Sequence, residues 1–210
     1  MSSPENKTLT ALDGIRVGHF TDLEGGTGVT VILFERPAIG AVDTTGMATS
    51  SRQIDSLEMM HPGSAVHAVC LAGGSAFGLD AATGVVRYLE EQGVGFDLVV
   101  TKLPIVPTAV IFDLSFMDPS ARPDPSMAYQ ACLNASSSPV EQGCVGAGTG
   151  ATSGKIRGVV SATKAGLGSS MVTGTNGART VSYTHLRAHE TVLELVCRLL
   201  LENKNTHPYT

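Results

Sequence analysis

The sequence predicts an α/β protein of the α+β type, built of packed layers, because hairpin-like strands are mixed with helices. Residues 29–34 (VTVILF) are apolar and largely β-branched, Pro37 is expected to end this strand, and residues 39–42 are expected to complete a hairpin-like pair. Helices are expected to open at Ser75 and Ser126. This mixture favours α+β layers over a strictly alternating parallel sheet.

The stretch 66–93 organises the chain as a strand, a glycine turn and a helix. Residues 67–72 form an apolar run of strand length, which Gly73-Gly74 ends. Ser75 is expected as the helix N-cap, and Gly93 suits the position just past the last turn. Because such a turn points several N–H groups at one spot, it is a ready site for an anion or oxyanion. The apolar positions at helical spacing are Leu79, Ala82, Val85, Val86 and Leu89.

The other elements follow from apolar runs and chain breakers. Residues 43–52 form a loop of small polar residues that is suited to line a pocket. Pro104 and Pro107 exclude a central strand between them, because proline donates no ladder hydrogen bond. Further expected elements are a strand at 14–20, a turn at 25–28, a helical turn at 54–60 ended by Pro62-Gly63, an apolar run at 109–114, a turn-rich loop at 118–125, a helix at 126–137, and strands at 158–162 and 168–173.

The composition is globular, with 42% of the 210 residues hydrophobic and 16% charged, enough for one sizeable core or two small ones. The net charge of -5, without a cluster of Lys and Arg, argues against nucleic acid as a partner. The first ten residues lack a secretory signal pattern, and no apolar run approaches the roughly 20 residues needed to span a bilayer. We therefore expect a cytoplasmic protein that does not enter a membrane. The dispersed cysteines, which fit reduced thiols better than disulfides or zinc ligands, are Cys70, Cys132, Cys144 and Cys197.

Residues 73–77 (GGSAF) resemble the nucleophile elbow G-x-S-x-G of serine hydrolases, in the required strand–turn–helix setting. Phe77, however, stands where the elbow has its last glycine. The later histidines that a triad would need are confined to the C-terminal end of the chain, at 185, 189 and 207. These two departures disfavour a Ser-His-Asp triad at Ser75.

The glycine-rich stretch 143–154 approximates a dinucleotide fingerprint at 146–150, but its third glycine comes one residue early and no strand–helix context surrounds it. Gly154-Lys155 lacks the first glycine and the hydroxyl residue of a P-loop. Glycines here are better explained by two backbones that approach closely, at a turn or beside a substrate.

The histidines do not predict a metal site. His185 and His189 are four residues apart, but the first is followed by Leu186 instead of the glutamate of zincins. The remaining ones before the C-terminal region, at 19, 61 and 67, are isolated and fit surface or satisfied core positions. We expect neither a metal nor another cofactor.

The character of the sequence changes after Thr180. Half of the histidines and half of the tyrosines fall in 181–210, and residues 181–202 resemble a translated sequencing adapter that was read through. The alternative is a natural C-terminal helix at 192–201. We expect residues 1–180 to be the natural part and residues 181–210 to be a non-native tail, which is excluded from the expected fold.

Five blocks in one order resemble the L-aminopeptidase/D-esterase family, which is also called DmpA-like or β-peptidyl aminopeptidase. The blocks are GIRVGH at 14–19, GTGVTVIL at 26–33, the stretch 66–93 with GGSAFGLDAA, LPIVPTAVIFDL at 103–114, and PVEQGCVGAGTGATSGK at 139–155. The resemblance implies a four-layer α-β-β-α sandwich, here incomplete. It also implies self-cleavage before a Ser or Thr, whose hydroxyl then releases N-terminal residues from peptides, amides or esters through an acyl-enzyme.

The resemblance ends before the part of the family that carries the nucleophile, so the catalytic residue is unknown. It implies a first subunit that is truncated, inactive by itself, and missing its second subunit, and it suggests a homo-oligomer of processed heterodimers. Without that partner, residues 29–34 or their neighbours are expected to leave an open sheet edge or an exposed patch. Six residues are expected to lie in the substrate or oxyanion pocket: Gly73, Gly74, Ser75, Gly146, Gly148 and Gly150.

Two other functions remain open on the sequence. An ornithine-acetyltransferase-like enzyme shares a related architecture and self-cleavage, but GGSAFGLDAA points away from it. A non-catalytic α/β domain would instead bind a small molecule or anion at the two glycine segments. Self-cleavage of the natural-length protein would separate the two enzymes from the binding domain.

Overall fold

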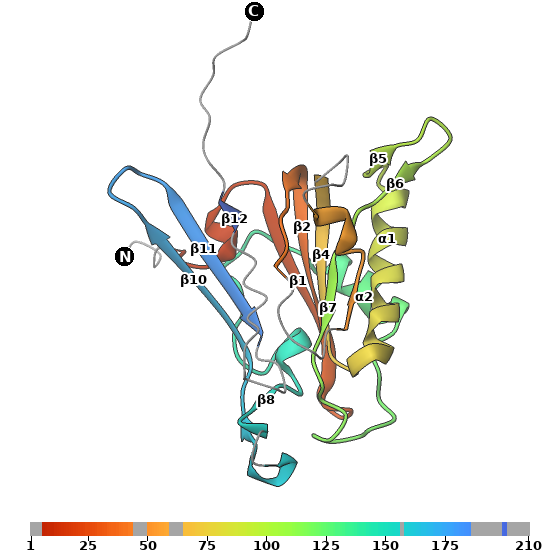
Figure 1. The fold of residues 1–210 in the computed structure, drawn as a ribbon, viewed down its shortest axis with the longest axis vertical. Helices are drawn as coiled ribbons and strands as arrows, with labels where there is room; N and C mark the ends of the chain where they lie inside the picture. The colour runs from red at the N-terminus through yellow and green to blue at the C-terminus, as the bar shows by residue number, and fades with distance from the viewer. Residues whose placement is uncertain (1–5, 44–49, 59–64, 156–157, 186–198, 201–210) are drawn as a thin grey trace, which may run out of the picture.

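The computed structural model describes residues 6–43, 50–58, 65–155, 158–185 and 199–200. These residues form three layers: two α-helices, a five-stranded sheet, and a three-stranded sheet on the other side (Figure 1). Three layers of the expected four-layer α-β-β-α sandwich are therefore present, and the predicted fold class is confirmed. Within the described part of the chain, no helix is long and apolar enough to cross a bilayer.

The five-stranded sheet has the order β1 (Ile15–Asp22), β2 (Thr27–Ile39), β4 (Ala65–Ala72), β7 (Thr108–Val110) and β3 (Ser51–Arg52). Neighbouring strands run antiparallel except β4 and β7, which are parallel. The mixed sheet agrees with the α+β expectation. β7 begins directly after the two prolines, as expected from their missing N–H groups.

Strand β2 has both faces buried, and its side chains alternate between two cores. Val29, Val31 and Leu33 pack with the helices, whereas Ile32 and Phe34 pack toward the second sheet. β2 also pairs with β1 on one edge and with β4 on the other. Residues 29–34 themselves therefore leave no open edge or patch, whereas their neighbour β1 lies at the edge of this sheet, as the expectation for 29–34 or their neighbours allowed.

The helices cover one face of this sheet (Figure 1). The chain turns from β4 into a 3₁₀-helix, η3 (Ser75–Ala81), which continues as α1 (Ala82–Glu91). Helix α2 (Pro125–Leu133) begins where Asp124 Oδ1 accepts the Met127 N–H at 2.9 Å, with proline at its first position. Ala128, Ala131 and Cys132 are buried on its inner side.

The second sheet consists of β10 (Leu167–Thr173), β11 (Arg179–His185) and β12 (Leu199–Leu200), all antiparallel. Leu167, Val181 and Tyr183 join the core that faces the first sheet. β11 crosses the expected boundary at residue 180, so it contains residues from both sides of it. The assignment of 181–210 as a non-native tail remains a prediction.

Short elements connect the layers. Two ribbons pair β5 (Phe96–Asp97) with β6 (Lys102–Leu103) and β8 (Thr152–Ser153) with β9 (Thr163–Lys164). The single 3₁₀ turns are η1 (Leu9–Ala11), η2 (Asp55–Leu57), η4 (Gly146–Gly148) and η6 (Val159–Ser161).

Several local predictions are wrong, each for a physical reason. Pro37 does not end β2, because the strand passes through it at a register shift between Leu33 and Ala38, where a ladder donor is not needed. Consequently 39–42 is not a separate strand, and β2 pairs instead with 15–22. Residues 158–162 contain η6 in place of a strand.

Helical structure begins at Ser75 as predicted, in the form of a 3₁₀-helix, but the predicted N-cap role of Ser75 is wrong, whereas the predicted end of the long helix is confirmed. The residue before the first turn is Gly74, with a φ of 77°, and no side chain caps that turn. Gly93 adopts a φ of +69°, as a residue just past a helix does. Pro62-Gly63 and residues 44–49 of the expected pocket loop lie outside the described residues.

Candidate functional site

Both predicted glycine segments meet at the end of the five-stranded sheet where β4 stops and α1 rises (Figure 1). The Gly73 N–H donates to Gly28 O at 3.0 Å, which joins the 73–75 turn to the beginning of β2. A Cβ added to Gly28 would lie 2.5 Å from Gly146 O, so the 146–150 turn passes directly over the same strand. Segments that are far apart in sequence therefore form one end of the molecule.

Asp113 lies between the two glycine segments. Its Oδ1 accepts the Gly74 N–H at 2.6 Å, and its Oδ2 accepts the Thr27 hydroxyl at 2.8 Å. A Cβ on Gly150 would stand 2.6 Å from Asp113 Cβ and 3.0 Å from its Oδ2. The carboxyl group thus touches the 73–75 turn, the start of β2 and the 146–150 turn together.

Glycine is required at 73 for this close approach. A Cβ there would overlap both Asp113 Oδ2 and Thr27 Oγ1. The close approach that the sequence suggested for the 143–154 glycines is confirmed at Gly150, whose added Cβ would also overlap Gly26 O. Gly73 and Gly150 thus leave space for the Asp113 carboxylate. A side chain at either position would occupy that space.

The Asp113 carboxyl is only 4% exposed, and this burial raises its pKa above the usual range. The hydrogen bonds from Gly74 and Thr27 act in the opposite direction, as does the positive charge of Lys155. The Lys155 ammonium donates to Phe112 O at 2.8 Å and to Thr152 O at 3.1 Å. A buried cation therefore lies beside a buried carboxylate, although the sequence around Lys155 is not a P-loop.

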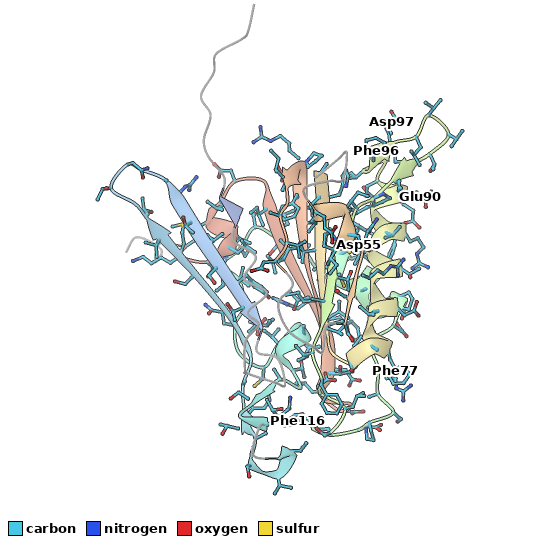
Figure 2. All side chains as sticks on the ribbon, viewed as in Figure 1. Asp55, Phe77, Glu90, Phe96, Asp97 and Phe116 are labelled. Atoms are coloured by element: carbon cyan, nitrogen blue, oxygen red, sulfur yellow. The ribbon has the colours of Figure 1, made fainter. Side chains whose placement is uncertain are left out.

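A second lysine ties the 146–150 turn to the ribbon that follows. Lys164 Nζ donates to Gly148 O at 3.1 Å, to Ala151 O at 3.0 Å and to Ala165 O at 2.5 Å. The same ammonium lies 5.2 Å from the centre of the half-exposed Phe116 ring. Figure 2 shows Phe116 close to β8 and Phe77 at the start of the long helix, at the same end of the molecule.

The backbone donors of the predicted pocket are engaged inside the protein. Gly73, Gly74 and Ser75 donate to Gly28 O, Asp113 Oδ1 and Ile111 O, respectively. Gly146 and Gly148 donate to Thr21 Oγ1 and Val145 O, each at 2.9 Å. In this structure these five N–H groups fix the turns, and they do not form a free row of donors. Whether the six predicted residues line a pocket remains a prediction.

Ser75 is only partly exposed and has a φ of 54°, a left-handed conformation that a non-glycine residue adopts rarely. Its neighbour Phe77 is 53% exposed and lies under the Arg122 guanidinium, 3.5 Å from the ring centre. His67, on the adjoining strand, is a satisfied core histidine, because its Nδ1 accepts the Ile105 N–H at 3.1 Å. This matches the interpretation of His67 as a core residue.

His19 is different, because it supports the 146–150 turn. Its Nδ1 lies 2.9 Å from Thr30 Oγ1, and that oxygen accepts the Ala147 N–H at 3.1 Å. The Thr30 hydroxyl has one donor proton and two acceptor positions, so it can serve both the Ala147 N–H and either tautomer of the His19 ring. Nε2 is buried without a hydrogen-bond partner among the described residues, and burial lowers the pKa of His19 to about 4.

Within the described ranges, no three His, Cys, Asp or Glu side chains are grouped to hold a metal ion. Cys70 and Cys132 are buried free thiols, and Cys144 is an exposed one. His189 and Cys197 lie outside these ranges, whereas His185 belongs to strand β11 and not to a helix.

Sequence reasoning located the glycine turns but missed the side chains that hold them. Asp113 is the only charged residue in the apolar run 109–114, and a lone acid in a run of that kind is a signal for a buried, partnered carboxylate. Thr27 and Thr30 carry no comparable signal, because threonine is common in strands. His19 was interpreted as isolated, since its partner Thr30 is known only once β1 pairs with β2.

Proteins with similar sequences indicate which family this chain resembles. An uncharacterised aminopeptidase of Mycobacterium leprae is 41% identical over 175 residues, which cover 76% of this chain and 48% of the relative. A 6-aminohexanoate-oligomer endohydrolase of Paenarthrobacter ureafaciens is 34% identical over 146 residues, covering 68% of this chain and 38% of that enzyme. The chain thus spans half or less of the length of these relatives.

Solved structures share the fold. A β-aminopeptidase of a Burkholderia species matches with a TM-score of 0.68 and 17% identity, over 89% of this chain and 54% of that one. The L-aminopeptidase D-Ala-esterase/amidase of Ochrobactrum anthropi, described as a variant of the Ntn-hydrolase fold, matches with a TM-score of 0.62 and 19% identity, over 88% of this chain and 53% of that one. The sequence model of peptidase family S58 matches residues 7–186. This chain therefore belongs to peptidase family S58.

Proposed function

We propose that the chain is the first-subunit region of a self-processing aminopeptidase-type hydrolase. The observation that carries this proposal is the family match over residues 7–186. The names of the relatives, aminopeptidase and oligomer endohydrolase, support hydrolysis of an amide bond. The proposed substrates are peptides, amino-acid amides or esters from which an N-terminal residue is released.

The proposed nucleophile is a Ser or Thr hydroxyl outside the matched residues. Self-cleavage before that residue would make it the N-terminus of a second subunit, so that its own α-amine can act as the base. Two of the histidines support this choice over a triad, because His19 pairs with Thr30 and His67 pairs with the backbone of Ile105. The match to the Mycobacterium leprae relative covers 48% of that protein, so the rest of such a protein has room for a second subunit.

The proposed reaction has two steps. The hydroxyl oxygen attacks the substrate carbonyl carbon, its proton passes to the base, and the amine or alcohol leaves with a proton, which gives an acyl-enzyme. Water then attacks the ester, releasing the acid and restoring the hydroxyl. In this scheme the 73–75 and 146–150 turns form a rigid wall of the pocket, and no metal or other cofactor takes part.

The proposed assembly is a processed heterodimer that forms a homo-oligomer in the cytoplasm. We propose that residues 1–180 belong to the first subunit and that residues 181–210 are a non-native tail, which makes this chain inactive by itself. The resemblance of residues 181–202 to a translated sequencing adapter supports the proposal that the tail is non-native.

The test is to resequence the 3′ end of the gene from untagmented template and to express the gene-length protein. We expect an intact-mass spectrum with two fragments that together account for the translated mass, and hydrolysis of aminoacyl p-nitroanilides. Replacing the new N-terminal Ser or Thr by Ala should abolish both cleavage and hydrolysis. A gene that ends at Thr210, or one uncut chain that binds small anions without turnover, would support a binding domain and overturn the proposal.

A further inference from the structure

We propose that Asp113 is a positioning residue that locks the 73–75 turn and the 146–150 turn into one arrangement through its ionised carboxylate. This inference rests on the proposed function, because both turns belong to the proposed hydrolase site. The six predicted pocket residues all lie on these two turns, so a residue that fixes one turn against the other sets the shape of the pocket wall.

The hydrogen bonds require a carboxylate. Asp113 Oδ1 accepts the Gly74 N–H at 2.6 Å, and Oδ2 accepts the Thr27 hydroxyl at 2.8 Å, so each oxygen receives a donor from a different element. An asparagine has only one acceptor oxygen and would turn an NH₂ group toward Gly74 or Thr27. Only the ionised acid serves both donors without a change in either partner.

The space available also selects aspartate. Gly73 lies against the carboxylate oxygens, and Gly150 lies against Asp113 Cβ, on the 146–150 turn. A glutamate would push its extra methylene group against Gly73 or Gly150, and neither glycine has a side chain that could move aside. The contact through Gly150 is therefore the step by which Asp113 reaches the second turn.

Packing alone does not explain a buried carboxylate at this position. Removing a charge from water costs free energy. If Asp113 only filled space, an apolar residue of similar size would do so at a lower cost in free energy. The fold instead surrounds Asp113 with two donors and the nearby Lys155 ammonium. Such an arrangement holds neighbouring groups in one geometry, which suits a pocket wall that must be rigid.

A titration followed by NMR tests the inference on the uniformly ¹⁵N- and ¹³C-labelled 210-residue protein. We expect the amide shifts of Gly74 and Gly150 to change with the same midpoint as the Asp113 carboxyl carbon. Asp113→Asn should abolish this shared titration. Asp118→Asn is the matched control, because Asp118 is exposed and its carboxylate accepts hydrogen bonds from nearby residues of its own loop, such as the Ser120 N–H and hydroxyl.

A second variant keeps the test decisive if Asp113→Asn does not fold. Thr27→Val removes one donor to the charged form, so the shared midpoint should rise by about 0.5–1 pH unit in both turns. If Gly150 does not titrate with Asp113, or if Thr27→Val leaves the midpoint unchanged, the inference is overturned.

The gene-length protein separates this inference from the proposed function. There Asp113→Asn should lower kcat by about tenfold or more and leave KM within about threefold, as expected for lost positioning. If the wild type neither cleaves itself nor hydrolyses substrate while both turns still titrate with Asp113, the hydrolase fails and the coupling of the turns stands. If hydrolysis is present and Asp113→Asn has normal kcat, the positioning role fails and the hydrolase stands.

Discussion

Thr27 Oγ1 donates a 2.8 Å hydrogen bond to Asp113 Oδ2, although 86 positions separate the two residues in the sequence. Thr27 is the first residue of β2, and Asp113 follows β7, on the other side of β4 in the sheet. Both side chains are almost completely buried, at 1% and 4% exposure. The bond therefore connects two non-adjacent strands at the end of the sheet where the glycine turns meet.

Replacing Thr27 by valine should destabilise the protein, because it leaves a buried carboxylate with one donor fewer. The expected loss in the free energy of unfolding at pH 7 is about 1–3 kcal/mol. Urea denaturation followed by circular dichroism measures it. Thr27→Ser keeps the hydroxyl and is the control, with a smaller loss that reflects one missing methyl group. Equal losses in the two variants would show that the hydroxyl contributes nothing.

The pH dependence of stability should report Asp113 with a defined sign. Burial raises the pKa of its carboxyl above the ordinary 3.8, against the effects of Gly74, Thr27 and Lys155. Between pH 3.8 and the raised pKa, the folded state holds this proton more often than the unfolded chain does. The contribution of Asp113 to stability should therefore fall as the pH rises through that window, and Asp113→Asn should remove it. A variant with an unchanged pH profile of urea midpoints would contradict the assignment.

His19 should give the opposite slope. Burial lowers its pKa from 6.5 to about 4, so between these values the unfolded chain binds a proton that the folded state does not. The contribution is present above pH 6.5 and is lost as the pH falls toward 4, by up to about 3 kcal/mol. His19→Asn keeps a potential acceptor near Thr30 and removes the titration. Urea midpoints measured from pH 4 to 7 should then vary less than in the wild type, and an identical variation would sink the idea.

How far the sequence predicts this fold depends on the range of the interactions that decide each element. The apolar, β-branched character of 29–34 is a local pattern, and both buried faces of β2 follow from it. The conformation of Gly93 is likewise decided by the helix immediately before it. Pro37 was misjudged because its effect depends on a register shift against β4, which no neighbouring residue encodes.

The glycine turns of the site were predictable from local sequence, but their side-chain partners were not, because those partners are distant in the sequence. The Gly73-Gly74 pair and the alternating glycines of 146–150 mark the two turns in the sequence, but the group that joins them is 39 positions from Gly74 and 86 from Thr27. Which donors are engaged, and which acid they bind, follows from the pairing of β4 with β7. Tertiary pairing therefore turned an expected row of free donors into an internal hydrogen-bond network.

Gly73→Ala tests the close approach directly. The new methyl group would overlap Asp113 Oδ2 and Thr27 Oγ1, and neither side chain can move into space that is already filled. We expect a loss of about 2–3 kcal/mol in the free energy of unfolding. Gly168→Ala is the matched control, because a Cβ there meets nothing within 4 Å and should change stability by less than about 0.5 kcal/mol. Combining Gly73→Ala with Asp113→Ala should cost less than the sum of the two single changes, since the second removes the clash.

Val99 offers the reverse case, a residue whose replacement should stabilise the protein. It lies in the turn between β5 and β6, next to Asp97, which Figure 2 marks at the far end of the molecule from Phe116. Val99 has a φ of 71° and is 97% exposed, so a β-branched side chain is held in a left-handed conformation without burial in return.

Val99→Asn should therefore raise the free energy of unfolding by about 0.5–1 kcal/mol, because asparagine adopts this conformation more readily. Val100→Asn is the matched control: Val100 is 88% exposed in the same turn, but its φ is not positive, so little change is expected. Thermal or urea unfolding of the two variants compares them directly.

Two hydrogen bonds close the turn: the Leu98 N–H donates to Thr101 O at 3.0 Å, and the Val99 N–H donates to Asp97 Oδ1 at 2.9 Å. Both bonds use groups that the substitution retains. A gain of the same size at both positions would trace the effect to lower surface hydrophobicity, whereas a gain confined to position 99 would trace it to backbone strain.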